Sequence, residues 1–326
     1  MRLIFCRGIF CALFAALFLT SGTVRAQDDT GDNNPTGPGR TNWVFTTRGI
    51  VTASPVLSED GLTLYVGSGD RYFYALHTGS EDEFPGTNRL KWKIKLGGPI
   101  FASATMDGEN IYVPCGDGRL YNLGDAGDRG VFRWEKPFRA RRTGISSPAV
   151  ADDGTLYVGS SDNNLYALYP EDGTVKNPWP FRAYTDLGTP VISSSGTNDD
   201  GTVFIVAGTL LLGVSTAAAE VSRFTPGARL RSVPALGEDG QLYFGANDER
   251  VYALDSGGTT NDLIWKYNTG KNVSSSPVVG ANGDIYIGSE SARLYCFRPT
   301  GELRWRSEST RLNSSHRIAS RMPSSA

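Results

Sequence analysis

One stretch of the chain, SSPAVADDGTLYVGSSDNNLYAL at Ser146–Leu168, recurs elsewhere as near-copies. Its most regular part is a short apolar run, found as LYVGSGD at Leu64, IYVPCGD at Ile111, LYVGSSD at Leu156, VFIVAGT at Val203, LYFGAND at Leu242 and IYIGSES at Ile285. Successive copies begin 47, 45, 47, 39 and 43 residues apart. A period in this range is typical of proteins in which each copy is one supersecondary unit that needs its neighbours to bury its apolar faces.

Each copy contains four extended segments. The first is a short piece such as SSPAV, the second is the LYVGS run, and the third is NLYAL or its equivalent. The fourth ends at an aromatic residue, and these residues are Trp92, Trp134, Trp179, Phe224, Trp265 and Trp305. Four strands per unit at this period predict a β-propeller blade. We therefore expect an all-β fold: a β-propeller of four-stranded antiparallel blades with six recognisable repeats.

The two ends of the repeat region leave the number of blades open. NWVFTT at Asn42 resembles a fourth strand that precedes its own first three, so it is predicted to be an N-terminal closing strand. Residues 307–326 have no blade pattern and are predicted to be a disordered or non-native tail. Either a seventh or eighth blade has been lost by truncation, or the ring has six blades and Trp43 packs outside it.

The unit SSPAVADDGTLYVGSSDNNLYALYPEDGTVKNPW resembles the blade of the PQQ-like (quinoprotein alcohol dehydrogenase-like) β-propeller repeat superfamily. The resemblance extends over about residues 42–306, while the fourth unit, GVSTAAAEVSRF, has lost most of the motif that ends the blade. In that superfamily the tryptophan of one blade docks on the motif of the next. The resemblance therefore implies that the structural blade staples are Trp43, Trp92, Trp134, Trp179, Trp265 and Trp305.

The N-terminus has the pattern of a secretory leader. Arg2 and Arg7 give a positive start, Ile9–Leu19 is an apolar run, and Val24–Ala26 offers small residues for cleavage. The run is shorter than a membrane span, and Cys11 lies inside it, so we expect a secreted or periplasmic protein without a lipid anchor. The predicted organisation is a signal peptide at 1–26, a disordered linker at 27–41, the propeller at 42–306 and the tail at 307–326.

The composition argues against several functions. The formal net charge is −2, and it becomes −5 when the three arginines of the leader are removed, so nucleic acid is not an expected partner. His77 and His316 are the only histidines, and neither has a ligand-spaced neighbour. Acidic pairs such as Asp152-Asp153 precede a glycine, which is typical of turns. We predict no catalytic residue and no metal site.

Cys115 and Cys296 are the two cysteines that follow the leader. Each falls at a strand position, so both are predicted to be buried structural thiols. The resemblance implies an adjacent cysteine pair and calcium ligands in a PQQ-dependent dehydrogenase, and this chain has no such pair. No cofactor is therefore predicted, with PQQ and calcium as the alternative.

Charged residues are sorted by type of loop. The turns between the first and second strands and between the third and fourth strands carry most acids, and they lie on one face of a propeller. The turns between the second and third strands contain Asp70, Asp117, Asp162 and Asp248 at equivalent positions, which predicts a structural role in every blade.

The loops between blades are basic. They are expected to surround the mouth of the central channel, and their cations are Arg48, Arg139, Arg141, Arg142, Arg182, Arg229, Arg231 and Lys271, against Asp186 alone. Guanidinium groups suit carboxylates and phosphates, so this face is predicted to bind an anionic partner. In the alternative, the cations pair with the nearby turn aspartates and are simply solvated.

The function favoured by the sequence is a non-catalytic extracytoplasmic binding or scaffold propeller. Its expected partner is a protein, peptide or glycan, acidic in character, bound through the basic loops. The alternative is a fragment or divergent member of the PQQ-dependent oxidoreductases. The oligomeric state does not follow from the sequence.

Overall fold

A computed structural model of the chain describes residues 44–79, 89–183, 185, 187–193, 201–238, 240–256 and 262–307. All regular structure in this part of the chain is β-strand, arranged in six antiparallel sheets. No helix among these residues is long and apolar enough to cross a membrane. Several predicted features lie outside the described residues: the signal peptide, the linker, Trp43, Asp186, His316 and nearly all of the tail.

Each sheet has its strands in chain order. The first sheet contains β1 (Val56–Leu57), β2 (Thr63–Gly67), β3 (Tyr72–His77) and β4 (Leu90–Lys95). The second contains β5 (Thr105–Asp107), β6 (Asn110–Cys115), β7 (Arg119–Asp125) and β8 (Gly130–Phe132), with β9 (Phe138–Arg139) also paired to β7. The third contains β10 (Ala149–Val150), β11 (Leu156–Gly159), β12 (Asn164–Leu168) and β13 (Phe181–Arg182).

The other three sheets repeat this order. The fourth contains β14 (Val191–Ser193), β15 (Thr202–Ala207), β16 (Leu210–Ser215) and β17 (Glu220–Phe224). The fifth contains β18 (Ala235–Leu236), β19 (Gln241–Gly245), β20 (Arg250–Asp255) and β21 (Leu263–Asn268). The sixth contains β22 (Val278–Val279), β23 (Ile285–Ser289), β24 (Arg293–Phe297) and β25 (Leu303–Arg306).

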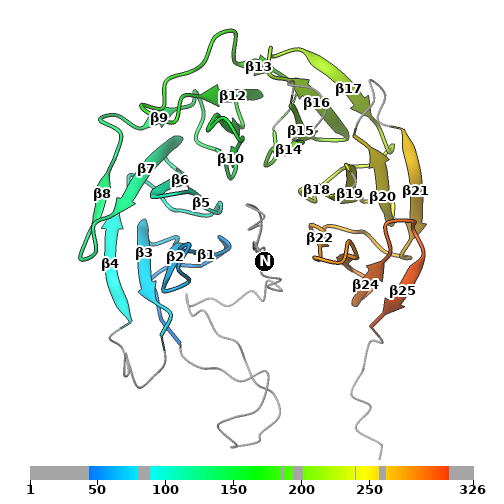
Figure 1. Cartoon of the computed structure of the whole chain (residues 1–326), viewed down its shortest axis with the longest axis horizontal. Coiled ribbons are helices and arrows are strands. Elements are labelled where there is room, and N and C mark those ends of the chain that lie inside the picture. The colour runs from blue at the N-terminus through cyan, green and yellow to red at the C-terminus, as the bar shows by residue number, and fades with distance from the viewer. Residues whose placement is uncertain are drawn as a thin grey trace, which may run out of the picture.

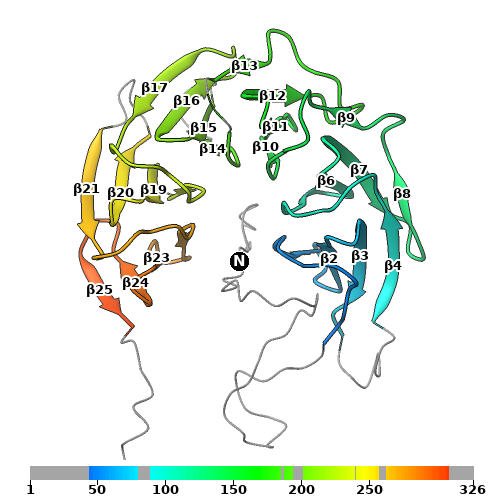
Figure 2. The ribbon, with the colours of Figure 1, turned by 180° about the vertical axis from the view of Figure 1, so that it is seen from behind.

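The six sheets are the blades of a propeller, which confirms the predicted fold. Their short first strands lie around a central axis, and their fourth strands lie at the outer rim (Figure 1). The blades form an arc, with the first and sixth at its two ends; the view from behind shows the same gap (Figure 2). No described strand lies in that gap, so the alternative of a closed six-bladed ring finds no support among the described blades.

In four of the six blades, a tyrosine and a tryptophan of one blade pack together, and the tryptophan bonds to the next blade. In the second blade, Tyr112 of β6 and Trp134, which follows β8, have ring centroids 5.7 Å apart, and Trp134 is only 4% exposed. Its indole N–H donates to the carbonyl oxygen of Pro170 in the third blade (2.8 Å), and Gly173 leaves room for the indole ring. The equivalent indole hydrogen bonds are Trp92 to Asp125 (2.9 Å), Trp179 to Thr216 (3.1 Å) and Trp265 to Pro299 (2.7 Å).

Trp305 in the sixth blade departs from this pattern. Its ring contacts Tyr286 as in the other blades (6.0 Å between centroids), but 42% of the residue is exposed. Within the described residues it has no hydrogen-bond acceptor, and no described strand of another blade lies beside it on that side.

The start of the described chain packs on the first blade as a fourth strand would. Phe45 contacts Tyr74 (5.6 Å between ring centroids), and the backbone N–H of Arg48 donates to Asp70 (3.0 Å). Two blade units later, Phe138 contacts Tyr166 (4.9 Å) and the N–H of Arg141 donates to Asp162 (2.9 Å). Residues 45–48 therefore make the contacts expected of the N-terminal closing strand.

Three of the predicted fourth strands differ clearly from the expectation. In the third blade β13 begins two residues after Trp179 and does not end at it. In the second blade the strand is divided into β8 and β9, because Pro137 lacks the N–H that a continuous ladder needs. In the fourth blade Ser222, not Phe224, occupies the tryptophan position: it lies opposite Gly213 as Trp265 lies opposite Ala253. Phe224 instead packs on Phe244 and Tyr252 of the fifth blade.

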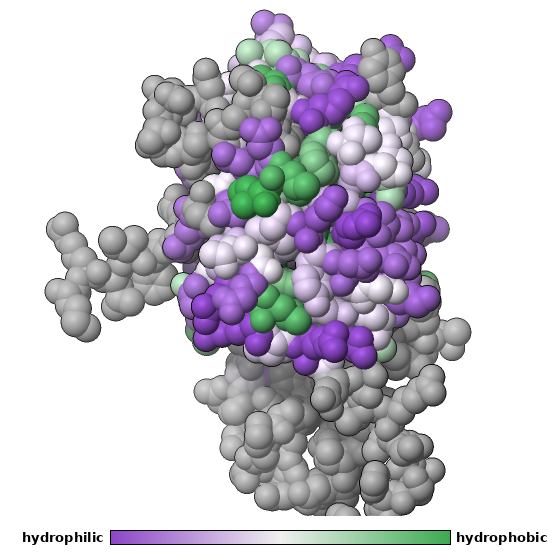
Figure 3. All heavy atoms as spheres, turned by 90° about the vertical axis from the view of Figure 1, so that its right-hand side faces the viewer, coloured by the Kyte–Doolittle hydropathy of each residue, from purple (hydrophilic) through white to green (hydrophobic). Residues whose placement is uncertain are grey.

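The outer rim is mixed in polarity. The side that contains β17, β21 and β25 is mostly hydrophilic, with apolar side chains in small separate patches (Figure 3). Exposed large apolar residues on these strands include Val221, Leu263, Ile264 and Trp305. Scattered patches of this size are normal for a protein surface.

Candidate basic binding face

The loops between blades and the turns between second and third strands form one face of the disc. We call these turns the tips and the connections between blades the crossing loops. The crossing loop after β4 bonds to two tips: the N–H of Leu96 donates to Arg71, and the carbonyl of Pro99 accepts from Gly116 (2.9 and 2.7 Å). Equivalent hydrogen bonds join Ala140 with Gly118, Ser161 with Gly144, Leu230 with Gly208, and Asn247 with Arg229. The crossing loops after β4, β9 and β17 are thus each fixed between two neighbouring tips.

The tip aspartates are engaged in structural hydrogen bonds. Asp162 accepts from the hydroxyl of Tyr166 (2.7 Å) and from the backbone N–H groups of Asn164 and Arg141. Burial favours the neutral acid, but these hydrogen bonds outweigh it and lower the pKa of Asp162. The same aspartate–tyrosine pairs are Asp70 with Tyr74, Asp117 with Tyr121, and Asp248 with Tyr252.

Two of these aspartates also pair with an arginine of their own blade. Arg119 lies 2.8 Å from Asp117, and Arg250 lies 3.1 Å from Asp248. The other two, Asp70 and Asp162, accept the backbone N–H of Arg48 and of Arg141, not the guanidinium groups of these arginines. The structural role predicted for the tip aspartates agrees with these contacts.

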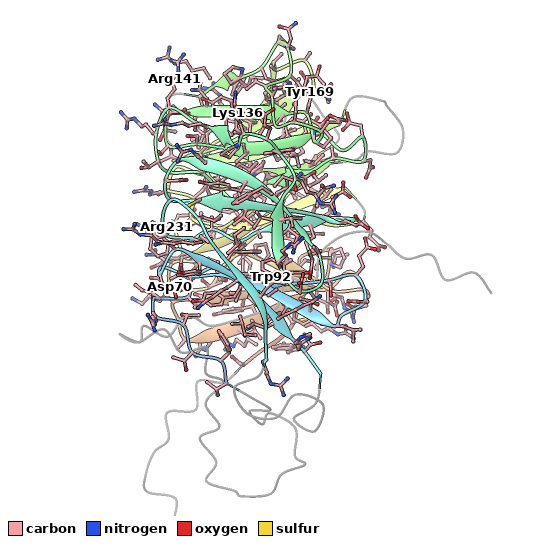
Figure 4. All side chains as sticks on the ribbon, turned by 90° about the vertical axis from the view of Figure 1, so that its left-hand side faces the viewer. Asp70, Trp92, Lys136, Arg141, Tyr169 and Arg231 are labelled. Atoms are coloured by element: carbon pink, nitrogen blue, oxygen red, sulfur yellow. The ribbon has the colours of Figure 1, made fainter. Side chains whose placement is uncertain are left out.

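The predicted cations are all exposed to solvent. They are Arg48, Arg139, Arg141, Arg142, Arg182, Arg229, Arg231 and Lys271, and none forms an ion pair with another described residue. Seen from the side, Arg141, Arg231 and Asp70 lie along one edge of the disc (Figure 4). The alternative in which these cations pair with the tip aspartates finds no support among the described contacts.

Two of the cations lie farther from the channel than expected. Arg139 belongs to β9 and Arg182 to β13, which are outer strands and not crossing loops. The remaining six occupy the crossing loops or, for Arg48, the segment that precedes the first blade. We call the surface that carries all eight the basic face; it extends from the outer rim toward the centre.

Comparison with known proteins identifies the family. Residues 20–258 and 247–318 match the model of the family described as outer membrane protein assembly factor BamB. The chain belongs to this family. The match agrees with the PQQ-like propeller resemblance that the repeats carry.

Individual relatives are more distant. Protein Rv3035 of Mycobacterium tuberculosis is 30% identical over 156 residues, which make up 45% of this chain but only 35% of that protein. The crystal structure of BamB from Moraxella catarrhalis matches with a TM-score of 0.59 and 19% identity, covering 82% of this chain and 77% of that one. The computationally designed protein Ika8 matches with a TM-score of 0.61 and 10% identity, covering 78% and 72%. At these identities the two structures support the fold alone.

The two cysteines are buried in different blades. Cys115 ends β6 of the second blade, and Cys296 lies in β24 of the sixth. Burial raises the pKa of the Cys115 thiol to about 11, and burial also raises the pKa of Cys296. Within the described residues, no group of three or more His, Cys, Asp or Glu side chains could hold a metal ion. Cys115 and Cys296, the two cysteines that the structure describes, lie in different blades and do not form the adjacent pair that the dehydrogenase resemblance implies.

Asp125 has a role that the charge pattern did not reveal. From the sequence it belongs to the acidic turns, but its carboxylate accepts from Tyr65, Lys91 and Trp92 of the first blade (2.7, 2.8 and 2.9 Å). Burial opposes ionisation, yet these donors outweigh it and lower the pKa of Asp125. Asp125 is therefore an interface residue between blades. Its position in the motif that ends the repeat is the sequence feature that could have indicated this role.

Proposed function

We propose that the protein is a non-catalytic scaffold that binds an acidic protein partner outside the cytoplasm through the basic face. Its membership of a family described as outer membrane protein assembly factors supports a protein-binding role. The observation that carries the proposal is the charge arrangement on this face. Eight cations are exposed without an ion pair among the described residues, while the tip aspartates are occupied by tyrosines and backbone groups.

Electrostatic attraction favours an anionic partner at the basic face. Exposed cations that lack fixed counter-ions attract anions and speed their encounter, and the attraction decreases over about 8 Å at physiological salt. Arginine also binds a carboxylate through two parallel hydrogen bonds, which gives orientation as well as attraction. A partner with carboxylates on its surface fits both requirements.

The test uses a labelled glutamate-rich peptide as the probe. The variant Arg139→Ala/Arg141→Ala/Arg142→Ala removes three charges from the basic face. The control Arg129→Ala/Arg133→Ala/Arg298→Ala removes three exposed charges elsewhere. We expect the first variant to raise the Kd about tenfold at 50 mM salt, because each exposed pair contributes up to about 1 kcal/mol, and the control to raise it much less.

Two outcomes would contradict the proposal. The first is a Kd that does not change between 50 and 300 mM salt. The second is an equal loss of affinity in the two variants, which would mean that net charge alone attracts the peptide. The extracytoplasmic location is tested separately by the N-terminus of the secreted protein, expected at Gln27.

A further inference from the structure

A hollow of about 330 Å³ opens on the basic face between the fourth and fifth blades. It lies among the crossing loop before β14, the tip between β15 and β16, and the crossing loop before β18. Its apolar base includes Leu187, Val206 and Leu230, which are 8%, 8% and 3% exposed. The base of the hollow is therefore mostly buried.

The repeat departs from its usual form at this place. In the third blade the tip has four residues, from Ser160 to Asn163, and contains Asp162. In the fourth blade it has two residues, Gly208 and Thr209, and no acid. The hollow lies beside this shorter tip. The tip also lacks the carboxylate that other tips carry at the equivalent position.

Two arginines stand at the edge of the hollow. Arg229 and Arg231 flank Leu230, whose backbone pairs with Ala246 and whose side chain is buried. Since side chains alternate along an extended segment, both arginines project away from the core, on the same side. Both are exposed, and neither forms an ion pair with a described residue.

The remaining polar groups support an anion. Thr185 and Thr189 line the hollow, and their hydroxyls make no hydrogen bond to other described residues. Ser232 is already engaged, because its hydroxyl donates to the carbonyl of Gly245 and accepts the N–H of the same residue. The hollow thus offers two guanidinium groups and two hydroxyl donors above an apolar base.

We propose that this hollow is the carboxylate-binding subsite of the basic face, and that it takes a glutamate side chain of an acidic peptide segment. The guanidinium groups of Arg229 and Arg231 hold the carboxylate, and the apolar base accepts the methylene groups. The volume is enough for one such side chain and part of a neighbouring residue. This inference rests on the proposed function, since it assigns the place on the basic face where a glutamate side chain of the partner binds.

The test compares two pairs of substitutions on the same face with equal loss of charge. The pair Arg229→Gln/Arg231→Gln alters the hollow, and Arg139→Gln/Arg142→Gln alters the basic face elsewhere. The probe is a blocked, labelled peptide that contains one Glu-Leu pair in a glycine and serine background. We expect the first pair to raise the Kd at least about tenfold and the second less than about threefold. The reason is that hydrogen bonds to charged groups contribute more binding energy than attraction between solvent-exposed charges.

Three further measurements make the result specific. A probe with glutamine in place of glutamate is expected to bind as weakly to the native protein as the glutamate probe binds to the Arg229→Gln/Arg231→Gln variant. The variant Arg231→Lys keeps the positive charge but loses the planar guanidinium group that can bind a carboxylate through two hydrogen bonds. Its Kd for the glutamate probe is therefore expected to lie between that of the native protein and that of the Arg229→Gln/Arg231→Gln variant. Equal melting temperatures of both double variants exclude a folding defect.

The possible results separate this inference from the proposed function. Equal losses in the two double variants would overturn the hollow as a subsite but leave the basic face as the binding surface. No binding of a glutamate-rich peptide to the native protein at 50 mM salt would overturn both. Tighter binding of a phosphoserine probe than of the glutamate probe would overturn the assignment to carboxylate.

Discussion

Substitution of the blade-interface tryptophans tests the fold most sharply, because the chain contains its own control. Trp134 is 4% exposed, contacts Tyr112 and donates to Pro170 in the next blade. Trp305 has the same contact with a tyrosine but is 42% exposed and has no described acceptor. The two residues differ mainly in whether a neighbouring blade covers the indole.

The magnitudes follow from that difference. Trp134→Ala leaves a cavity between two blades, which costs about 3–5 kcal/mol, and leaves the Pro170 carbonyl without its donor, which costs about 1 kcal/mol more. Trp305→Ala loses the burial of about half a side chain and opens no cavity against a neighbour, so we expect about 1–2 kcal/mol. Urea unfolding at 25 °C measures both. Equal losses within about 0.5 kcal/mol would refute the role of the next blade.

A glycine pair refines the same test. Gly173 has φ of +73°, and a Cβ there would stand 2.7 Å from Cζ3 of Trp134. Gly227 has φ of +85° with open space around it. Gly227→Ala is expected to cost about 1 kcal/mol from backbone strain alone, and Gly173→Ala about 1–3 kcal/mol more because the indole is displaced.

Three other predictions concern protonation and chemistry. The pKa of Asp162 is lowered in the folded state, so its contribution to stability is complete above about pH 5 and is lost as the pH falls through its folded pKa. Asp162→Asn is therefore expected to make the free energy of unfolding depend less on pH in the acidic range. An unchanged dependence in that range would contradict this. Cys115 and Cys296, in a chain whose two leader cysteines are replaced by serine, are expected to react with a thiol reagent only after unfolding, and rapid reaction of the native protein would show that they are accessible. Addition of PQQ and calcium is expected to give no bound chromophore and no dye reduction, and clear activity would favour an oxidoreductase.

The sequence predicted the second and third strands well, because they carry the regular part of the repeat. Leu156–Gly159 and Asn164–Leu168 lie where LYVGS and NLYAL place them. The first strands are shorter than the extended segments suggested. In SSPAV only Ala149–Val150 form a strand, although the N–H of Ser146 also donates to Gly159, because Pro148 between them has no N–H to give to a neighbour. The fourth strands were least predictable, because Pro137 divides one of them and Ser222 replaces tryptophan in another.

The candidate site was predictable in composition but not in geometry. The cations of the basic face could be named from the loops, yet their exposure depends on the tip aspartates being occupied by residues such as Tyr166, which lies four positions along the chain. Asp125 belongs to the turns that carry most acids, and the sequence does not show that Lys91 and Trp92 of another blade reach it. The hollow beside Leu230 arises from the packing of three loops, and no pattern in one of them predicts it.

The tryptophan contacts also bear on how the molecule opens. Each described indole hydrogen bond joins a blade only to the next one. The stability of the propeller is therefore approximately a sum of contributions from the interfaces between neighbouring blades. The sixth blade has one described neighbour, and its own indole is uncovered. Local unfolding should then begin in β22 to β25, and the amide hydrogens of β24 should exchange with solvent sooner than those of β12, well before the remaining blades separate.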